Sequence, residues 1–335
     1  MTRLIEVGTG DAIPAATASA DTAPLTQDEL SRHEPDRHLM LVDDHGAIQA
    51  RASCWWTSTP LLPQHRVGLI GHYAASTEAS GLEVLREALT RLERAGCTIA
   101  VGPMDGNTWR RYRFIAERGS EPAFFLEPDN PDEWREQFER AGFSVMATYT
   151  SALSTDLTQE DPRLARTQAS LAEKGITIRT LRSDDADTDL RGIFRLSLES
   201  FQQNYLYTAI AEDEFLEQNR RVLPYVLPEL VLLAEREGHP VGFLFAVPDI
   251  LQRQRGSRID TIIIKTVAVS PTVASAGLGG LLVGLAQRRA RELWFSRAIH
   301  ALMHEQNLSR NISRHYARTI RRYALFVRPL SRSRA

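Results

Sequence analysis

The pattern of apolar and polar positions predicts an α/β chain whose second half alternates strands and helices. The β-branched run at residues 262–269 ends just before Pro271, as expected of a buried strand. Leucines with helical spacing follow it, at Leu278, Leu281, Leu282 and Leu285. Short apolar runs at 298–303 and 323–327 have strand length, and residues 309–318 between them have helix length. This half therefore predicts the order strand, long helix, strand, polar turn, short helix, strand.

The first half repeats that order without repeating the sequence. Its predicted elements are a short helix at 27–32 within the loop-rich segment 9–37, strands at 38–43, 47–57 and 66–74, a helix at 80–95, a strand at 98–101, a helix around Trp109 capped by Asn107, a helix at 131–140 and a strand at 144–150. Gly96 stands where a left-handed residue commonly ends a helix. The recurrence of one order predicts two similar domains in tandem.

A polar segment separates the two halves. Residues 156–174 include a helical stretch at 162–173 and are typical of a linker. We therefore predict a first domain at 1–155, a linker at 156–174 and a second domain at 175–335. A chain of 335 residues is long enough for two domains of ordinary size.

Composition narrows the classes of partner. The chain is 43% hydrophobic and 24% charged, with a formal net charge of −2, which argues against nucleic acid as the main partner. Cys54 and Cys97 are too few for a disulfide framework, so we expect a cytoplasmic protein. No leader pattern opens the chain and no apolar run has membrane-spanning length, so we expect no membrane partner. A homodimer is left open.

Three glycines after the strand at 262–269 predict an anion site. Gly277, Gly279 and Gly280 open the leucine-rich helix, where unpaired backbone N–H groups and the helix dipole attract phosphate. No lysine follows them, which excludes a P-loop. Leu282 stands where a dinucleotide fingerprint needs its third glycine, and such a unit normally opens its domain. Glu305, just past the next apolar run, does match the acidic residue of that fingerprint.

The glycine segment resembles the pyrophosphate loop of the GNAT superfamily of N-acetyltransferases. That loop follows a strand ending in roughly Leu-x-Val-x-Pro, and 267–271 match this strand end, with Gly277 and Gly279 matching the loop. Ala274 departs from the family's basic or amide residue. The resemblance implies that acetyl-CoA is a cosubstrate. It implies binding through Val267, Ala268, Val269, Ala274, Ser275, Ala276, Gly277, Leu278, Gly279 and Gly280.

The same resemblance supplies candidate catalytic groups. Tyr316 matches a family tyrosine that protonates the coenzyme A sulfur, although Ser309 and Ile312 replace the family's asparagine and alanine there. A core tyrosine is the structural alternative. Ser309 and Asn307 are candidate cofactor contacts, and Asn307 is equally suited to cap the short helix.

Transfer to an amine also needs a base that removes the ammonium proton, and this base must lie beside the expected thioester. His304 and Glu305 follow the strand at 298–303, and a histidine titrates near neutral pH. The alternative is an ordinary hydrogen-bonding role in a turn. His300 and His304 lack a third ligand, so we expect no metal site. Lys265 interrupts the strand at 262–269 and points either to the pocket or to the domain interface. The aromatic and amide residues of 201–207 are candidates to shape the acceptor pocket.

The first half departs from the pattern where phosphate would bind. Glu78, beside a single glycine in 76–81, would repel a pyrophosphate at a helix N-terminus. Residues 138–143 resemble the family's Tyr-x-x-x-Gly-Phe, but Phe138 lacks the hydroxyl. We therefore predict a degenerate first domain that packs on the second and walls the acceptor pocket.

The resulting expectation is two GNAT-like domains in tandem, each a mixed sheet flanked by helices. The second would transfer an acetyl group from acetyl-CoA to the amine of a small molecule or peptide. The alternative is a non-catalytic binding or regulatory protein that retains the fold. Gly277, Gly279 and Tyr316 favour the enzyme, whereas Ala274 and Ser309 favour the alternative.

Overall fold

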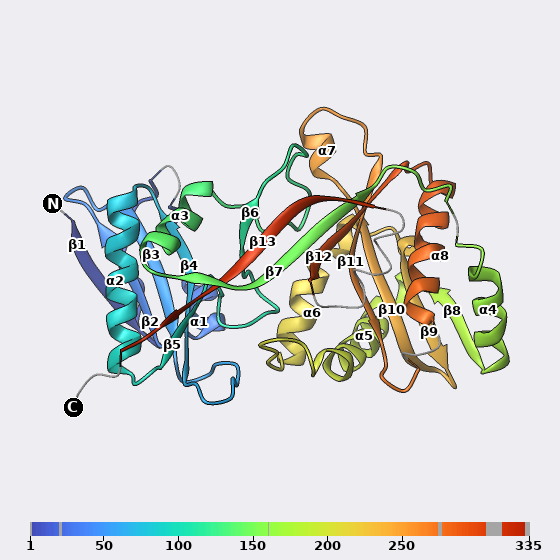
Figure 1. Ribbon diagram of the computed structural model, residues 1–335, viewed down its shortest axis with the longest axis horizontal. Coiled ribbons are helices and arrows are strands. Elements are labelled where there is room, and N and C mark those ends of the chain that lie inside the picture. The colour runs from blue at the N-terminus through green and yellow to red at the C-terminus, as the bar shows by residue number, and fades with distance from the viewer. Residues whose placement is uncertain (1, 20–21, 160, 274–276, 306–316, 332–335) are drawn as a thin grey trace.

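One mixed sheet runs through the whole molecule (Figure 1). The computed structural model describes residues 2–19, 22–159, 161–273, 277–305 and 317–331. Its sheet has 13 strands in the order β1-β2-β3-β4-β5-β13-β7-β12-β11-β10-β9-β8, and β6 pairs with β13 off this path. The first half of the chain builds one end of the sheet and the second half builds the other.

The first half and the linker contain the following elements. They are β1 (Arg3–Gly8), α1 (Gln27–His33), β2 (Arg37–Val42), β3 (Ile48–Trp55), β4 (Val67–Ala75), α2 (Glu78–Arg94), β5 (Ile99–Gly102), β6 (Phe114–Glu117), α3 (Asp132–Arg140), β7 (Ser144–Ser154) and α4 (Leu164–Glu173). The predicted helices at 27–32, 80–95 and 131–140 and the linker helix are confirmed. Strands β1 and β6 were not predicted.

The second half follows the same plan. It contains β8 (Ile176–Thr180), α5 (Ala186–Phe201), α6 (Glu212–Arg220), β9 (Val231–Arg236), β10 (His239–Pro248), α7 (Leu251–Gln254), β11 (Thr261–Val269), α8 (Leu278–Glu292), β12 (Arg297–His304) and β13 (Arg318–Pro329), with short 3₁₀ turns at Ser183–Asp185, Leu223–Tyr225 and Pro228–Leu230. The predicted strand–glycine–helix unit is therefore β11 and α8. The expected helix at 309–318 falls largely outside the described residues, and Arg318 begins β13.

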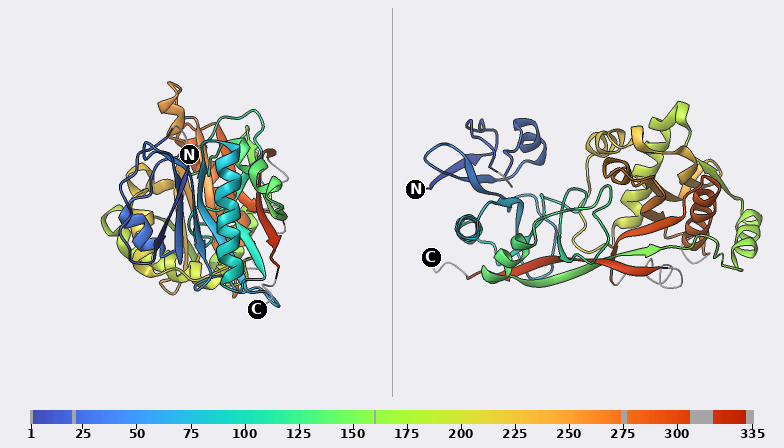
Figure 2. Two further views of the ribbon diagram at one scale, coloured as in Figure 1. Left: turned by 90° about the vertical axis from the view of Figure 1, so that its left-hand side faces the viewer. Right: turned by 90° about the horizontal axis from the view of Figure 1, so that it is seen from above.

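The two halves exchange their last strands. Strand β7 of the first half pairs antiparallel with β12 of the second, whereas β13 of the second half pairs antiparallel with β5 of the first. The exchanged strands also pair with each other, from Arg318↔Leu153 to Val327↔Ser144. Figure 2 shows both strands running from one half to the other. The predicted domain boundaries therefore stay predictions, since the sheet is continuous through them.

Helices cover the sheet so that each half has its own core. Helix α2 buries Leu85, Leu89 and Leu92 against β2, β3 and β4. It is followed by Gly96 at φ 80°, as predicted for its C-terminal end. In the second half, α8 packs its leucines on β10 and β11, while α5 and α6 cover the opposite face. Both faces of the second-half sheet are thus buried.

The predicted helix around Trp109 is wrong. Asn107 does accept hydrogen bonds from the backbone N–H groups of Trp109 and Arg110, at 2.9 and 3.1 Å. The chain then reverses, because Tyr112 forms an antiparallel bridge with Met104. Trp109 donates its indole N–H to the Thr208 carbonyl of the second half. Asn107 therefore supports a turn that docks on the other half, and long-range contacts override the local capping signal.

A buried ion pair fixes β13 to the first half. Arg321 and Glu127 are both fully buried, and the Arg321 Nε lies 2.8 Å from Oε1 of Glu127. The Arg321 guanidinium also donates to the carbonyls of Arg118, Glu121 and Pro122. Burial raises the pKa of Glu127, while a hydrogen bond from Tyr323 acts against this. Removing the arginine would leave a buried carboxyl without its cation.

The substitution Arg321→Met should therefore lower the free energy of unfolding by about 3–5 kcal/mol. Arg318→Met is a matched control on the same strand, because Arg318 pairs with Glu121 but its side chain is 58% exposed. That control should lose at most about 1 kcal/mol. Urea unfolding followed by circular dichroism measures both. Equal losses would show that the exchanged strand does not depend on the buried pair.

Candidate active site

The paired strands β11 and β12 separate partway along their length. They pair in parallel from Thr261↔Arg297 to Ile264↔His300, although β11 continues to Val269 and β12 to His304. Beyond this point β12 keeps its pairing with β7, and β11 keeps its pairing with β10. The facing backbone groups of the two strands are no longer paired with each other, and such groups require other partners.

The N-terminus of α8 lies beside this split. Gly277 is its N-cap residue at φ 77°, a left-handed conformation that glycine adopts without strain. No side chain of the described residues caps the helix. A Cβ atom added at Gly280 would meet nothing within 4 Å. The first turn therefore directs its backbone N–H groups and its positive potential toward open space at Gly280.

A cavity of about 1660 Å³ joins the split to the α8 N-terminus. Of the predicted cofactor contacts, it is lined by Val267, Ala268, Val269, Gly277, Gly279 and Gly280. Leu278 instead buries its side chain in the core against Gly242. The remaining candidates, Ala274, Ser275, Ala276, Asn307, Ser309 and Tyr316, lie outside the described residues. The binding roles of all these residues stay predictions.

Both halves and the linker wall the cavity. The first half contributes residues 108–113, 126–129 and Tyr149. It therefore borders this cavity, as we expected of the first half. The linker contributes Leu164 and Thr167. The aromatic segment after α5 contributes Phe201, Gln203, Asn204, Tyr205 and Tyr207. The strand exchange explains this composition, because it brings first-half loops against the split in the second half.

His304 lines the cavity, but Glu305 does not. The His304 ring packs edge-on to Tyr149, with ring centroids 5.0 Å apart. Burial lowers the pKa of His304, and the nearby Arg113 charge adds to this effect. Glu305 accepts a hydrogen bond from the Thr148 hydroxyl and forms an ion pair with Arg322 at 2.8 Å. His304 is therefore placed to meet a ligand, and the catalytic roles of both residues stay predictions.

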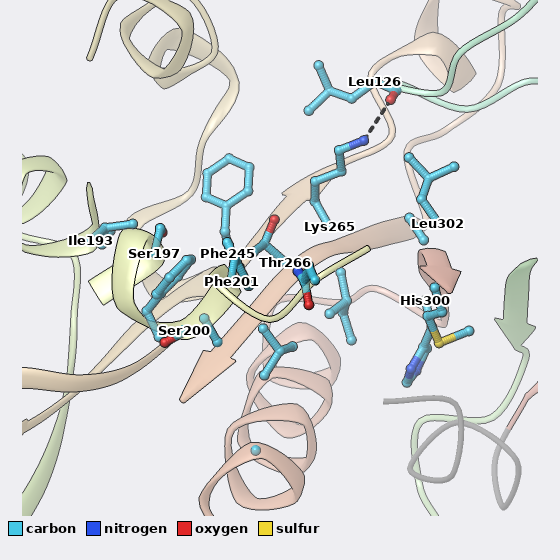
Figure 3. A pocket seen from close by; sticks show the side chains of 18 of the residues that line it. Leu126, Ile193, Ser197, Ser200, Phe201, Phe245, Lys265, Thr266, His300 and Leu302 are labelled. Carbon is cyan, nitrogen blue, oxygen red and sulfur yellow. Dashed lines mark hydrogen bonds between the residues drawn. The ribbon is translucent and has the colours of Figure 1, made fainter. Parts of the chain in front are cut away.

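Lys265 is the first residue of β11 beyond the split. The pairing with β10 skips it, since Phe245 faces Thr266 and Ala246 faces Ile264. It is therefore the extra residue of a β-bulge, a device that re-aims side chains near active sites. Figure 3 shows its side chain reaching toward Leu126 of the first half, whose carbonyl accepts a hydrogen bond from Nζ at 3.0 Å.

The environment of Lys265 makes it titrate in an unusual range. Burial lowers the pKa of Lys265 to about 7, and the charge of Arg113 acts in the same direction. A lysine with this pKa exchanges protons at neutral pH. The feature of the sequence that pointed to Lys265 was a single lysine within an apolar strand. Both directions considered for its side chain are found, because Lys265 lines the cavity and also contacts the first half.

The corresponding split in the first half is filled by protein. Strands β4 and β5 pair only from Val67↔Ile99 to Leu69↔Val101. The chain at Met104 then enters the gap, and its N–H donates to the Ile70 carbonyl at 2.9 Å. The fit is so close that a Cβ at Gly71 would lie 2.1 Å from the Met104 oxygen. No ligand can enter this split without displacing the backbone.

The N-terminus of α2 is also occupied by its own side chains. Thr77 and Ser80 form a capping box. Glu78 is ion-paired with Arg140. Phe138 is fully buried in the aromatic cluster, 5.1 Å from both Tyr73 and Phe114 between ring centroids. Protein side chains therefore occupy the positions in the first half where a cofactor would bind, as expected of a degenerate domain.

Among the described residues, histidine, cysteine and carboxylate side chains form no group of three that could hold a metal ion. None of the helices described is both long and apolar enough to cross a bilayer.

Comparison with known proteins gives the fold. No family model and no curated protein matches the sequence. Among solved structures, the chain is similar to a GCN5-related glucosamine N-acetyltransferase region of a fungal multidomain GH3 β-N-acetylglucosaminidase, with a TM-score of 0.52 and 14% identity over 87% of this chain and 33% of that chain. It thus spans only a third of the fungal protein.

A second similar structure is closer in length. It is a GCN5-related N-acetyltransferase from Sphaerobacter thermophilus, with a TM-score of 0.50 and 14% identity over 87% of this chain and 80% of that chain. At such identity the likeness concerns the fold alone. Together with the repeated order of elements, it shows that this protein has the GNAT fold, present twice in tandem along one chain.

Proposed function

We propose that the protein is an acyl-CoA-dependent N-acyltransferase with one donor site, in its second half. The observation that carries the proposal is the contrast between the two splits. The split at β11 and β12 opens into a cavity beside a helix N-terminus that no described side chain caps, whereas the split at β4 and β5 is filled by Met104. A phosphorylated donor fits only the former.

The residues present fit acetyl-CoA. Gly277, Gly279 and Gly280 would hold the pyrophosphate through backbone N–H groups, in the way helix N-termini bind anions. The edge of β11 at 267–269 that no longer pairs with β12 would hold the amides of the pantetheine arm by strand-like hydrogen bonds. Acetyl-CoA supplies the thioester, and an acceptor amine takes its acetyl group with release of a thiol.

Residues of the chain would manage the protons. An amine must be neutral to act as a nucleophile, so the site needs a group that removes its proton. Lys265 is placed at the split and is half neutral near pH 7, and His304 is the other candidate on the cavity wall. Tyr316 remains the proposed acid for the leaving thiolate.

The rival is a protein that binds the donor without transferring its acyl group. The departures at Ala274 and Ser309 favour it. The proton-exchanging Lys265 in a cavity shared by both halves favours the enzyme. A thiol-release assay with acetyl-CoA across small amines and peptides separates the two, since only the enzyme releases coenzyme A faster than the acetyl-CoA blank.

Donor binding should be weakened by a carboxylate at the helix N-terminus. Gly279→Glu adds bulk and a like charge where the phosphate would lie, so acetyl-CoA affinity should fall by more than about tenfold, or roughly 1.4 kcal/mol. Ala79→Glu is the matched control, since Ala79 occupies the second position of α2, as the half-buried Gly279 does in α8. Calorimetry on both folded variants measures this. Unchanged affinity in Gly279→Glu would refute the placement of the site.

Burial of Lys265 should make stability depend on pH. Its pKa is about 7 in the folded protein and about 10.4 in an unfolded chain. Between these values the unfolded chain binds more protons, so the free energy of unfolding rises with pH. Lys265→Met removes this effect. Its Tm relative to the unmodified protein should be highest at pH 7 and should decline toward pH 10.

The control for this experiment is Lys174→Met at the exposed end of α4. Its Tm difference from the unmodified protein should not change with pH. A Lys265→Met difference that is equally flat would show that the lysine is not desolvated in the folded protein.

Tyr316→Phe tests the proposed acid once an accepted amine is in hand. Loss of the hydroxyl should reduce turnover by about 10²–10⁴-fold, the usual contribution of general acid catalysis. Acetyl-CoA affinity should hardly change, because the ring is kept. Steady-state thiol release together with calorimetry gives both values. Near-native turnover would assign Tyr316 to the core.

A further inference from the structure

Arg113 is a buried cation on the wall of the cavity that the proposed donor site does not use. It follows the turn at Asn107, and its relative exposure is only 7%. Its backbone is left-handed, with φ 67°, which is uncommon for a residue other than glycine. Its N–H is fixed by the Pro103 carbonyl at 2.9 Å. The chain therefore holds this side chain in the cavity wall at some conformational cost.

Two tyrosine rings, nearly perpendicular to each other, hold the guanidinium. Its central carbon lies 3.9 Å from the ring centroid of Tyr112 and 4.2 Å from that of Tyr149. Such cation–π contacts stabilise the charge. The rings lie at 85° to each other, so the planar group can stack on only one of them, and the N–H donors that do not face the other ring need hydrogen-bond partners.

The in-plane donors of Arg113 are poorly satisfied. Nε has no hydrogen-bond partner in the described part of the chain. Nη1 makes only a long contact of 3.4 Å, to the Leu302 carbonyl. Within those same residues, no carboxylate forms an ion pair with Arg113. A buried arginine remains charged, so its unmet donors are expensive unless an anion meets them.

The neighbouring Arg110 shows what a structural arginine of this wall does. Its guanidinium contacts Glu214 through Nε and Nη2, at 2.6 and 2.9 Å, and also donates to the carbonyls of Arg32 and His33. The positive charge of Arg110 is thus paired with a carboxylate of the protein. Arg113 has no such carboxylate partner among the described residues, although it is buried to a similar extent.

The position of Arg113 relates it to the reaction centre. Leu302, which it contacts, lies on β12 beyond the split, while Lys265 lies on β11 beyond the same split. Each arm of the split therefore has a cation beside it. This end of the cavity is formed with the first half, and it is distinct from the glycines of α8 that would bind phosphate.

We propose that Arg113 is a carboxylate-binding subsite, so that one of the two substrates carries a carboxylate. The inference rests on the proposed function and names the substrate class of the same cavity. A planar guanidinium held by these two rings can meet a carboxylate through two parallel N–H donors. The carboxylate belongs either to the acceptor, as in an amino acid, or to the acyl group of the donor.

The first arm of the test addresses the acceptor. The full-length protein, with and without saturating coenzyme A, is titrated by calorimetry with each proteinogenic amino acid and its carboxamide. An acid should bind at least about tenfold more tightly than its amide. Arg113→Met should abolish this preference, and Arg113→Lys should retain part of it because the charge remains.

The second arm addresses the acyl group, by comparing succinyl-CoA with acetyl-CoA in the same three proteins. A preference for succinyl-CoA that is lost in Arg113→Met supports the subsite and assigns the carboxylate to the donor. The proposal is overturned if the unmodified protein shows no preference for a carboxylate in either arm. It is also overturned if the preference survives in a folded Arg113→Met variant.

The unmodified protein decides the matter even if Arg113→Met does not fold, because the acid–amide comparison needs no variant. The two proposals also fail separately. If the unmodified protein did not bind acetyl-CoA, the donor site would be refuted. The amino-acid titrations without coenzyme A would still test the role of Arg113.

Discussion

The reciprocal exchange of β7 and β13 is the constraint on which the rest of the structure depends. Each strand completes the sheet beside the other half, and the two pair along most of their length. Main-chain hydrogen bonds of a continuous sheet leave little freedom between the halves. The loops at 108–113 and 126–129 are thereby held against the split in the second half. The cavity exists because the halves cannot separate.

The two halves solve one physical problem in opposite ways. Two parallel strands that diverge leave backbone groups in need of partners. At β4 and β5 the protein supplies them itself, through Met104, and caps α2 with Thr77 and Ser80. At β11 and β12 it leaves a cavity instead, beside a helix N-terminus that no described side chain caps. The asymmetry places the cavity in the second half and makes the first half part of its wall.

Sequence reasoning found what local chemistry determines. The strand ending before Pro271, the glycines and the helix after them follow from residue types at short range, and so does Gly96. Long-range contacts explain the misses. Asn107 has the chemistry of a helix cap, but the bridge of Tyr112 to Met104 reverses the chain. The direction of the Lys265 side chain depends on a β-bulge in β11 opposite β10, and the hydrophobic periodicity of the sequence does not reveal a bulge. Arg113 gave no local signal, because its tyrosine partner Tyr149 comes from another strand.

The central claim is that this tandem fold has one donor site. Titration of the unmodified full-length protein with acetyl-CoA in a calorimeter tests it directly, because the stoichiometry counts the sites without any knowledge of the acceptor. The account predicts one molecule bound per chain. A stoichiometry of two would show that the split at Met104 opens to ligand, and absence of binding would show that the glycines of α8 do not form a donor site.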